Sequence, residues 1–173
     1  ELATTGGAEL AGELRARSAD HLVFVSEAGT RALAEAACVA TLLPTAAFYL
    51  RLGRFAPARA LVEAGAPVAL ATDVNPGGGL SPSLPHAMAI GCFSMGLALE
   101  EALCAVTVNA AFSLDLHGEV GSIEVGKRAD LVLLRSARLL DLVRVGVSAV
   151  RTVVKDGRVV VRDGRLERPA ARP

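Results

Sequence analysis

The stretch that decides the fold is residues 68–79, VALATDVNPGGG, in which an apolar run leads to one carboxylate, Asp73, and then to a glycine-rich loop. With Pro67 in front, residues 67–73 have the length and apolar character of a β-strand that is buried on both faces. The Asn-Pro-Gly-Gly-Gly segment that follows favours a turn over a strand or a helix. We therefore expect a buried strand that presents an acid at its carboxyl end.

Upstream of this strand, helical and strand patterns alternate. Leucines on one helical face predict a helix over residues 8–14, and Ser26 is the predicted N-cap of a helix that runs through residues 31–37. Apolar runs predict further strands at residues 21–26 and 39–44, and Pro57 and Gly65 are predicted to bound another helix. This alternation predicts an α/β fold with a parallel sheet, either open and doubly wound or closed as a (β/α) barrel.

The pattern changes in the last third of the chain. Residues 97–114 are patterned as one helix, whereas short β-runs separated by Asp-Gly pairs follow Gly118. Asp156-Gly157 and Asp163-Gly164 are typical of β-hairpin turns. We expect an α/β domain over residues 1–116 and a small antiparallel β-module over residues 117–173.

Composition excludes several classes of partner. The 18 basic and 18 acidic residues cancel, and no basic patch indicates nucleic-acid binding. No apolar run approaches the roughly 18 residues that span a bilayer. The three cysteines lack the spacing of a disulfide framework or a zinc ribbon, which indicates a reducing, cytoplasmic setting.

Candidate chemistry lies where the predicted parallel strands end. Asp73 at such an end can bind a metal, act as a base or cap the next helix, and its Asp-x-Asn-Pro-Gly context also suits a plain turn. His21 can be a ligand, a partner of a bound water, or a structural histidine satisfied by Asp20 or by main chain. His86 and His117 lie in loop-like sequence and receive no predicted role.

Five stretches, taken in order, carry a resemblance to a known family. They are SADHL (18–22), AEAACVATLLP (34–44), FAPARALVEAGAPVALATDVNPG (55–77), EEALCAVTVNAA (100–111) and GSIEVGKRADLVLL (121–134). Together they resemble the C-terminal half of the imidazolonepropionase family of the amidohydrolase superfamily. The last stretch by itself indicates only the superfamily. The combination of SADHL, LLP, FAPAR and ATDVNPG narrows the resemblance to the one family. The resemblance implies the C-terminal part of a metal-dependent (β/α)8 barrel, plus a small β-sandwich built from both chain ends.

The resemblance also implies an activity. Members of this family open the ring of 4-imidazolone-5-propanoate to give N-formimidoyl-L-glutamate during histidine degradation. They hold one metal ion, Zn²⁺ or Fe³⁺, with a His-x-His pair on the first strand, a histidine on the fifth and an aspartate on the eighth. Asp73 matches that aspartate, and His21 matches the sixth-strand histidine near the metal-bound water. Both are implied to take part in catalysis.

The family's substrate-binding loop maps onto Asn75, Gly77 and Gly78, although many relatives have serine where Gly78 stands. The position of GGAEL (6–10) aligns Glu1 with the last residue of a fifth-strand His-Ala-Asp/Glu-Glu motif, which implies a proton shuttle that also contacts substrate. On this alignment the chain begins three residues after a metal-binding histidine. We therefore expect a fragment that is inactive alone, binds metal weakly, and aggregates or forms a homodimer.

Three alternatives remain open at this point. Another amidohydrolase, such as a guanine or cytosine deaminase or a dihydropyrimidinase-like enzyme, would share the eighth-strand aspartate and the GSIEVGK ending. A non-catalytic half-barrel would account for the missing ligands. A nucleotide-binding α/β protein has little support, because no predicted strand is followed by GxGxxG or by a Walker loop.

Overall fold

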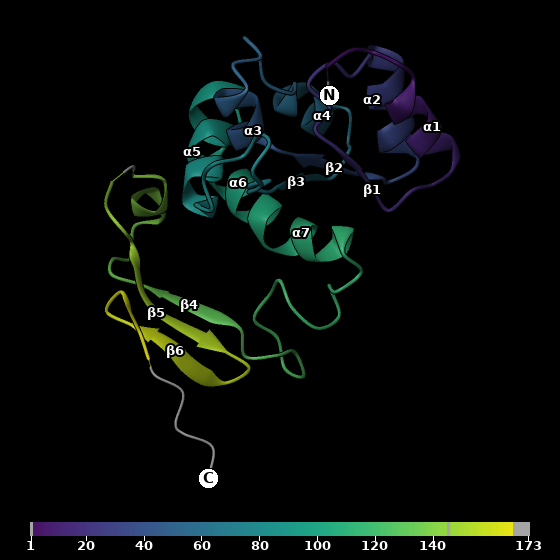
Figure 1. The fold of residues 1–173 in the computed structure, drawn as a ribbon. Helices are drawn as coiled ribbons and strands as arrows, with labels where there is room; N and C mark the ends of the chain where they lie inside the picture. The colour runs from purple at the N-terminus through teal and green to yellow at the C-terminus, as the bar shows by residue number, and fades with distance from the viewer. Residues whose placement is uncertain (1, 145, 168–173) are drawn as a thin grey trace.

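Three short parallel strands form the centre of the N-terminal part of the chain in a computed structural model, which describes residues 2–144 and 146–167 (Figure 1). The strands are β1 (Ser18–Asp20), β2 (Val39–Leu42) and β3 (Val68–Leu70), and they pair in the order β1-β2-β3. All pairs are parallel, with Asp20 beside Thr41 and Leu42 beside Leu70. The predicted parallel α/β arrangement is thus confirmed.

One predicted strand is wrong. The apolar run at residues 21–26 forms a turn rather than a strand, because β1 ends at Asp20. His21 and Leu22 both adopt left-handed backbone conformations, with φ of 66° and 56°, and such residues leave a strand. The apolar side chains of Leu22 and Val23 are still buried, so this run owes its hydrophobic character to packing against the core.

Helices cover the parallel sheet. The first four are α1 (Gly7–Glu13), α2 (Glu27–Glu35), α3 (Pro44–Tyr49) and α4 (Ala58–Glu63). Ser26 caps α2 as predicted, since its hydroxyl accepts a hydrogen bond of 2.8 Å from the Gly29 amide. Gly65 follows α4 with a positive φ of 86°, as its predicted C-cap role requires.

The remaining helices are α5 (Leu84–Met95), α6 (Leu99–Val106) and α7 (Val108–Ser113). They differ from the prediction in two places. His86 lies in α5 and not in a loop, because Ser83 caps that helix by accepting from the His86 amide at 3.3 Å. The single helix expected over residues 97–114 is divided at Thr107, whose φ and ψ of −123° and −88° are not helical.

A second, antiparallel sheet follows the helices. It contains β4 (Leu131–Leu134), β5 (Val150–Lys155), β6 (Arg158–Arg162) and β7 (Arg165–Leu166), with the 3-10 helix η1 (Leu139–Val143) between the first two strands. Asp156 and Asp163 have φ near 50° and each precedes a glycine with positive φ, which confirms both predicted hairpin turns. In Figure 1 this sheet lies below α6 and α7, apart from the parallel sheet.

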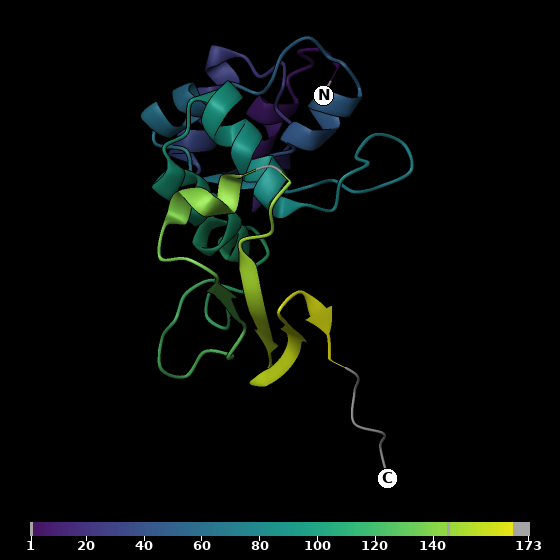
Figure 2. The same ribbon diagram turned by 90° about the vertical axis from the view of Figure 1, so that its left-hand side faces the viewer.

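Neither the barrel nor the sandwich is complete in the part of the chain that the structure describes. The parallel sheet has β1 and β3 as its edges, and residues 2–144 and 146–167 contain one antiparallel sheet instead of a facing pair. The loop between β3 and α5 extends away from the rest of the chain in Figure 2. Across the described residues, no helix has both the length and the apolar character needed to cross a membrane.

The core lies between the parallel sheet and its helices. Its fully buried large side chains include Leu33, Leu42, Leu61 and Leu70, contributed by α2, β2, α4 and β3. Thr45, at the start of α3, is a fully buried polar residue in the same region. This packing fixes the carboxyl ends of the strands, where the candidate site begins.

Candidate metal and substrate site

Asp73 stands three residues beyond the end of β3. Its backbone is left-handed, with φ of 50°, a conformation that aspartate and asparagine enter more readily than most residues. The buried hydroxyl of Thr45 donates a short hydrogen bond to the Thr72 carbonyl, which joins the start of α3 to the exit of β3. This hydrogen bond fixes the residue before Asp73 and so places Asp73 at the carboxyl edge of the sheet.

The side chain of Asn75 organises the loop after Asp73. Its Nδ2 atom donates to the Asp73 main-chain oxygen at 2.8 Å and to the Asp73 carboxylate oxygen Oδ1 at 2.9 Å. Its Oδ1 atom accepts from the Gly77 amide at 2.7 Å and from the Gly78 amide at 2.9 Å. Asn75 therefore joins the candidate metal ligand to the glycine segment.

Gly79 closes the loop. The Asn75 amide donates to the Gly79 carbonyl at 3.0 Å, and Val74 and Gly79 form an isolated parallel β-bridge. A Cβ atom at position 79 would lie 1.9 Å from the Asp73 carbonyl oxygen, so the main chain requires glycine at this position. By contrast, a Cβ at Gly78 would meet only the flexible end of Leu50, at 3.3 Å.

His21 lies at the same edge of the sheet, directly after β1. Its amide donates to the Thr41 carbonyl at 3.0 Å, which extends the pairing of β1 with β2, and its left-handed backbone turns the chain out of the sheet. Because β2 lies between β1 and β3, His21 and Asp73 follow the two outer strands of this sheet. Glu1 lies outside the described residues.

The predicted site residues do not make a complete metal centre by themselves. Within residues 2–144 and 146–167, the structure has no group of three or more His, Cys, Asp or Glu side chains that could hold a metal ion. Asp73 fits one part of such a centre, since Oδ1 accepts from Asn75 and no hydrogen bond within the described part of the chain reaches the other carboxylate oxygen, Oδ2. The assignment of Glu1, His21, Asn75, Gly77 and Gly78 to catalysis or substrate binding stays a prediction.

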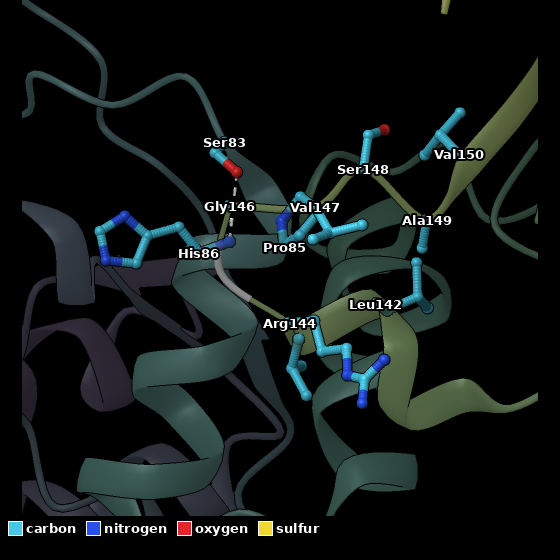
Figure 3. A pocket seen from close by; sticks show the side chains of 11 residues that line it. Ser83, Pro85, His86, Leu142, Arg144, Gly146, Val147, Ser148, Ala149 and Val150 are labelled. Carbon is cyan, nitrogen blue, oxygen red and sulfur yellow. Dashed lines mark hydrogen bonds between the residues drawn. The ribbon is translucent and has the colours of Figure 1, made fainter. Parts of the chain in front are cut away.

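A cavity of about 370 Å³ lies elsewhere, between the start of α5 and the segment after η1 (Figure 3). Its lining is largely apolar, with Pro85, Leu142 and Val147 among the contributors. The imidazole of His86 points away from Val147 and Ser148 in Figure 3, and its ring lies 6.0 Å from that of Phe48. The lining does not include Asp73, so this cavity is separate from the candidate metal site.

The thiols of Cys38 and Cys92 are not activated nucleophiles. Burial, with a smaller contribution from Asp20, raises the pKa of Cys38, and burial followed by the charge of Glu100 raises the pKa of Cys92. A raised thiol pKa leaves less thiolate at neutral pH. Cys38 is buried and Cys92 is half-buried, whereas Cys104 is exposed.

Three features of this site were not predicted from the sequence. Thr45 gave no signal, because its role depends on the contact of α3 with β3 across 27 residues of chain. The bond from the Gly77 amide to the Asn75 side chain could have been found from the Asp-x-Asn-Pro-Gly pattern, because an asparagine side chain commonly bonds the main-chain amide two residues on. Nothing in the sequence distinguished Gly79 from Gly77 and Gly78.

Comparison with known proteins shows the family to which this chain belongs. The profile of the amidohydrolase family matches residues 6–160, which is most of the chain. The chain therefore belongs to the amidohydrolase family.

Within that family, the most informative relatives carry one name. The chain is 50% identical over 167 residues to the imidazolonepropionase of Geobacillus sp. strain WCH70, which covers 96% of this chain and 39% of the relative. It is 48% identical over 159 residues to the imidazolonepropionase of Parabacteroides distasonis, covering 91% of this chain and 38% of the relative. The chain thus spans about two fifths of the length of these relatives.

Solved structures agree with the fold. An adenosine deaminase from Xanthomonas campestris with bound zinc superposes with a TM-score of 0.73 at 25% identity, over 88% of this chain and 38% of that one. The atrazine chlorohydrolase TrzN from Arthrobacter aurescens TC1, complexed with zinc, has a TM-score of 0.76 at 19% identity, over 95% and 44% of the two chains. The three-stranded parallel sheet therefore corresponds to part of an amidohydrolase domain, in which relatives bind zinc.

Proposed function

We propose that this chain is the C-terminal part of an imidazolonepropionase, a metal-dependent hydrolase that converts 4-imidazolone-5-propanoate to N-formimidoyl-L-glutamate. The observation that carries the proposal is the 50% identity over 96% of the chain to a relative of that name. The adenosine deaminase, by comparison, is 25% identical to this chain. Residues 1–116 would belong to a (β/α)8 barrel and residues 117–173 to a β-sandwich.

Asp73 would supply one ligand of a single Zn²⁺ or Fe³⁺ ion. Carboxylate oxygen suits either cation, and the remaining ligands would come from histidines that precede this chain in a longer protein. When bound, such an ion polarises a water molecule and lowers its pKa from about 15.7 towards about 7. Asp73 fits this role because it lies at the carboxyl edge of the sheet with Oδ2 not engaged by the described residues.

Two further groups would handle the proton and the nucleophile. The Glu1 carboxylate would accept a proton from the attacking water and return it to the ring nitrogen that leaves, acting first as a base and then as an acid. The imidazole of His21 would orient that water by a hydrogen bond. Gly77 and Gly78 lack Cβ atoms, which would let the flat imidazolone ring approach the main chain.

The test is an assay of the full-length protein that carries this chain. We expect it to consume 4-imidazolone-5-propanoate and to release N-formimidoyl-L-glutamate, identified by mass spectrometry. Guanine, cytosine and adenosine, assayed in parallel, are expected to remain unchanged. Treatment with a chelator should abolish turnover, and added Zn²⁺ or Fe³⁺ should restore it. Turnover of a nucleobase in place of the imidazolone would reject the proposal.

A further inference from the structure

We propose that Asp163 is a site of spontaneous isoaspartate formation, whereas Asp156, in a nearly identical sequence, is protected. Both aspartates precede a glycine, in residues 155–158 and 162–165, which read KDGR and RDGR. Both pairs form the turn of a β-hairpin, with φ of 49° at Asp156 and 48° at Asp163. Neither aspartate belongs to the candidate site of the proposed function.

The modification is a rearrangement of the main chain that needs no partner except water. The Gly164 amide nitrogen attacks the protonated carboxyl carbon of Asp163, so that an N–C bond forms, a C–O bond breaks and one water molecule leaves. Water then adds to the main-chain carbonyl of this five-membered succinimide and breaks the bond from that carbonyl to nitrogen. The chain is left linked through the Asp163 side chain, and the former main-chain carbonyl becomes a free carboxylate.

The charges around the two carboxylates are alike. Each has two cationic side chains at 3.4 to 3.9 Å from Oδ1, namely Arg128 and Lys155 beside Asp156, and Arg135 and Arg151 beside Asp163. Both turns are exposed, and a Cβ atom at Gly157 or Gly164 would have no neighbour closer than 3.9 Å. Sequence, charge and exposure therefore do not distinguish the two sites.

The main-chain amides do distinguish them. The Gly157 amide, which would be the nucleophile at Asp156, donates a hydrogen bond of 3.0 Å to the Ala129 carbonyl. The Asp156 amide donates to the Asp130 carboxylate at 2.8 Å. Within residues 2–144 and 146–167, the Gly164 amide donates to no main-chain acceptor. Attack by Gly157 thus costs a hydrogen bond that attack by Gly164 does not.

The strands beside the two turns differ as well. The Asp156 turn joins β5 to β6, which have six and five residues, whereas the Asp163 turn joins β6 to β7, which has two. In the described part of the chain, β7 pairs with β6 alone. The Asp163 amide bonds the Arg151 carbonyl at 2.7 Å, which anchors the start of the turn and not Gly164. A short edge strand opens at a lower free-energy cost than a longer hairpin, so the Asp163 turn reaches the ring-closing geometry more often.

Isoaspartate at position 163 would release β7. The rearranged main chain runs through Cβ and Cγ of this residue, which adds one carbon to a turn that now fits two residues between paired strands. The whole β6–β7 ladder consists of the pairs Arg162–Arg165 and Val161–Leu166. We therefore expect faster amide hydrogen exchange at Arg165 and Leu166 in the modified protein.

The experiment follows the full-length protein that carries this chain during incubation for several weeks at neutral pH, either folded or unfolded in urea. Samples are digested with endoproteinase Asp-N, which cleaves before aspartate and not before isoaspartate. Mass spectrometry then measures each modified site as the peptide left uncut at Asp156 or at Asp163. Methyl transfer from S-adenosylmethionine by a protein isoaspartate methyltransferase measures the total independently.

In the folded protein we expect isoaspartate to form at Asp163 about 5- to 30-fold faster than at Asp156, because one or two hydrogen bonds separate the turns. In urea the two rates should be similar, since both turns are lost. Asp130→Ala removes the acceptor of the Asp156 amide and should raise the rate at Asp156. The rate at Asp163 is the internal control in that variant, and thermal unfolding shows that its fold is retained.

Three results would overturn the inference. The first is an equal rate at the two sites of the folded protein, or a faster rate at Asp156. The second is a ratio in urea as large as that in the folded protein, which would make sequence neighbours the cause. The third is an unchanged rate at Asp156 in folded Asp130→Ala; if that variant does not fold, the wild-type ratios decide. The proposed function would stand in each case, because no readout depends on turnover.

Discussion

At the scale of single residues, the candidate site depends on a left-handed aspartate. Asp73 has a φ of 50°; the Thr45 hydroxyl holds the preceding Thr72 carbonyl, and the Asn75 side chain bonds the Asp73 carboxylate. Left-handed backbone with positive φ is uncommon for residues other than glycine, and it persists where surrounding contacts hold it. Aspartate at position 73 therefore suits both the left-handed backbone and the proposed role as a metal ligand.

Replacement of Asp73 by alanine in the full-length protein should reduce turnover of 4-imidazolone-5-propanoate to below about one hundredth of the wild-type rate. Removal of a residue that only orients a metal ligand typically costs about 10- to 100-fold in activity, and removal of the ligand itself should cost more. The fold should be retained, because the side chain of Asp73 is not part of the core. Activity is measured by substrate depletion and folding by circular dichroism. Near-normal turnover would show that Asp73 is not a ligand.

A second prediction concerns Gly79. Gly79→Ala would place a Cβ atom 1.9 Å from the Asp73 carbonyl oxygen, and the loop would have to move. We expect the free energy of unfolding to fall by about 1–3 kcal/mol, as overpacked sites do, and the metal affinity of the full-length protein to fall as well. Gly118→Ala is the control, because a Cβ at Gly118 meets no atom within 4 Å. Equal stability of the two variants in urea unfolding would contradict the prediction.

At the scale of elements, α1 and α2 pack closely because glycines lie between them. A Cβ atom at Gly12 would come within 2.7 Å of the Cβ and carbonyl oxygen of Ala32, and one at Gly29 would come within 2.8 Å of the Ala8 Cβ. Neither glycine has a positive φ, so close approach and not backbone conformation explains them. The bond of 2.5 Å from Ser26 to Glu9 joins the same two helices and is the main cause of the lowered pKa of Glu9.

Gly12→Ala should therefore force α1 away from α2. We expect a loss of about 1–3 kcal/mol in the free energy of unfolding, measured by urea denaturation. Gly7→Ala is the matched control on the same helix, where added Cβ atoms meet open space. That variant should be neutral or more stable by up to about 1 kcal/mol, because alanine is the better helix former. Destabilisation of both variants to the same extent would rule out close packing as the cause.

The start of α6 is joined to α4 by an ion pair. Arg59 donates to both carboxylate oxygens of Glu101, at 2.8 and 3.0 Å, and Glu101 also accepts from the Ala98 amide at 2.8 Å. The Arg59 guanidinium, and then the Ala98 amide, hold the pKa of Glu101 below its ordinary value of 4.5. A lowered pKa means that the unfolded chain takes up the proton first as the pH falls, so this stabilisation is present above pH 4.5 and is lost below it.

Glu101→Gln should then lower the stability at pH 7 by about 1 kcal/mol, and the difference from the wild type should vanish as the pH falls below about 4. Urea unfolding at several pH values measures this. Glu63→Gln is the control, because Glu63 contacts the same arginine from an exposed position on α4. Its effect should be smaller, about 0.3–0.5 kcal/mol. A Glu101→Gln difference that stays constant from neutral to acidic pH would contradict this explanation.

At the scale of the whole molecule, the parallel sheet is open. Among the described residues, β1 and β3 each pair with β2 alone, and an open edge of this kind favours association with other chains. Large apolar side chains are also exposed on the helices, among them Phe93 on α5 and Val108 on α7. Both features are expected of a chain that matches about two fifths of its relatives.

The 173-residue chain expressed alone should therefore show no turnover of 4-imidazolone-5-propanoate and should bind Zn²⁺ weakly, because one carboxylate does not make a four-ligand site. We also expect dimers or aggregates, measured by sedimentation velocity over a range of concentrations. The full-length protein is the control for activity. Turnover by the chain alone, or a monomer at all concentrations, would contradict this prediction.

The sequence by itself determined the parallel α/β class, the Ser26 cap, the two Asp-Gly hairpins and the family. These features depend on local conformational preference or on short motifs, which are readable in one dimension. The tertiary structure decided that β1 ends at Asp20, that Thr107 divides α6 from α7 and that His86 lies in a helix. It also decided that the Thr45 hydroxyl bonds the Thr72 carbonyl next to Asp73, because contacts between separate segments form only when the chain packs.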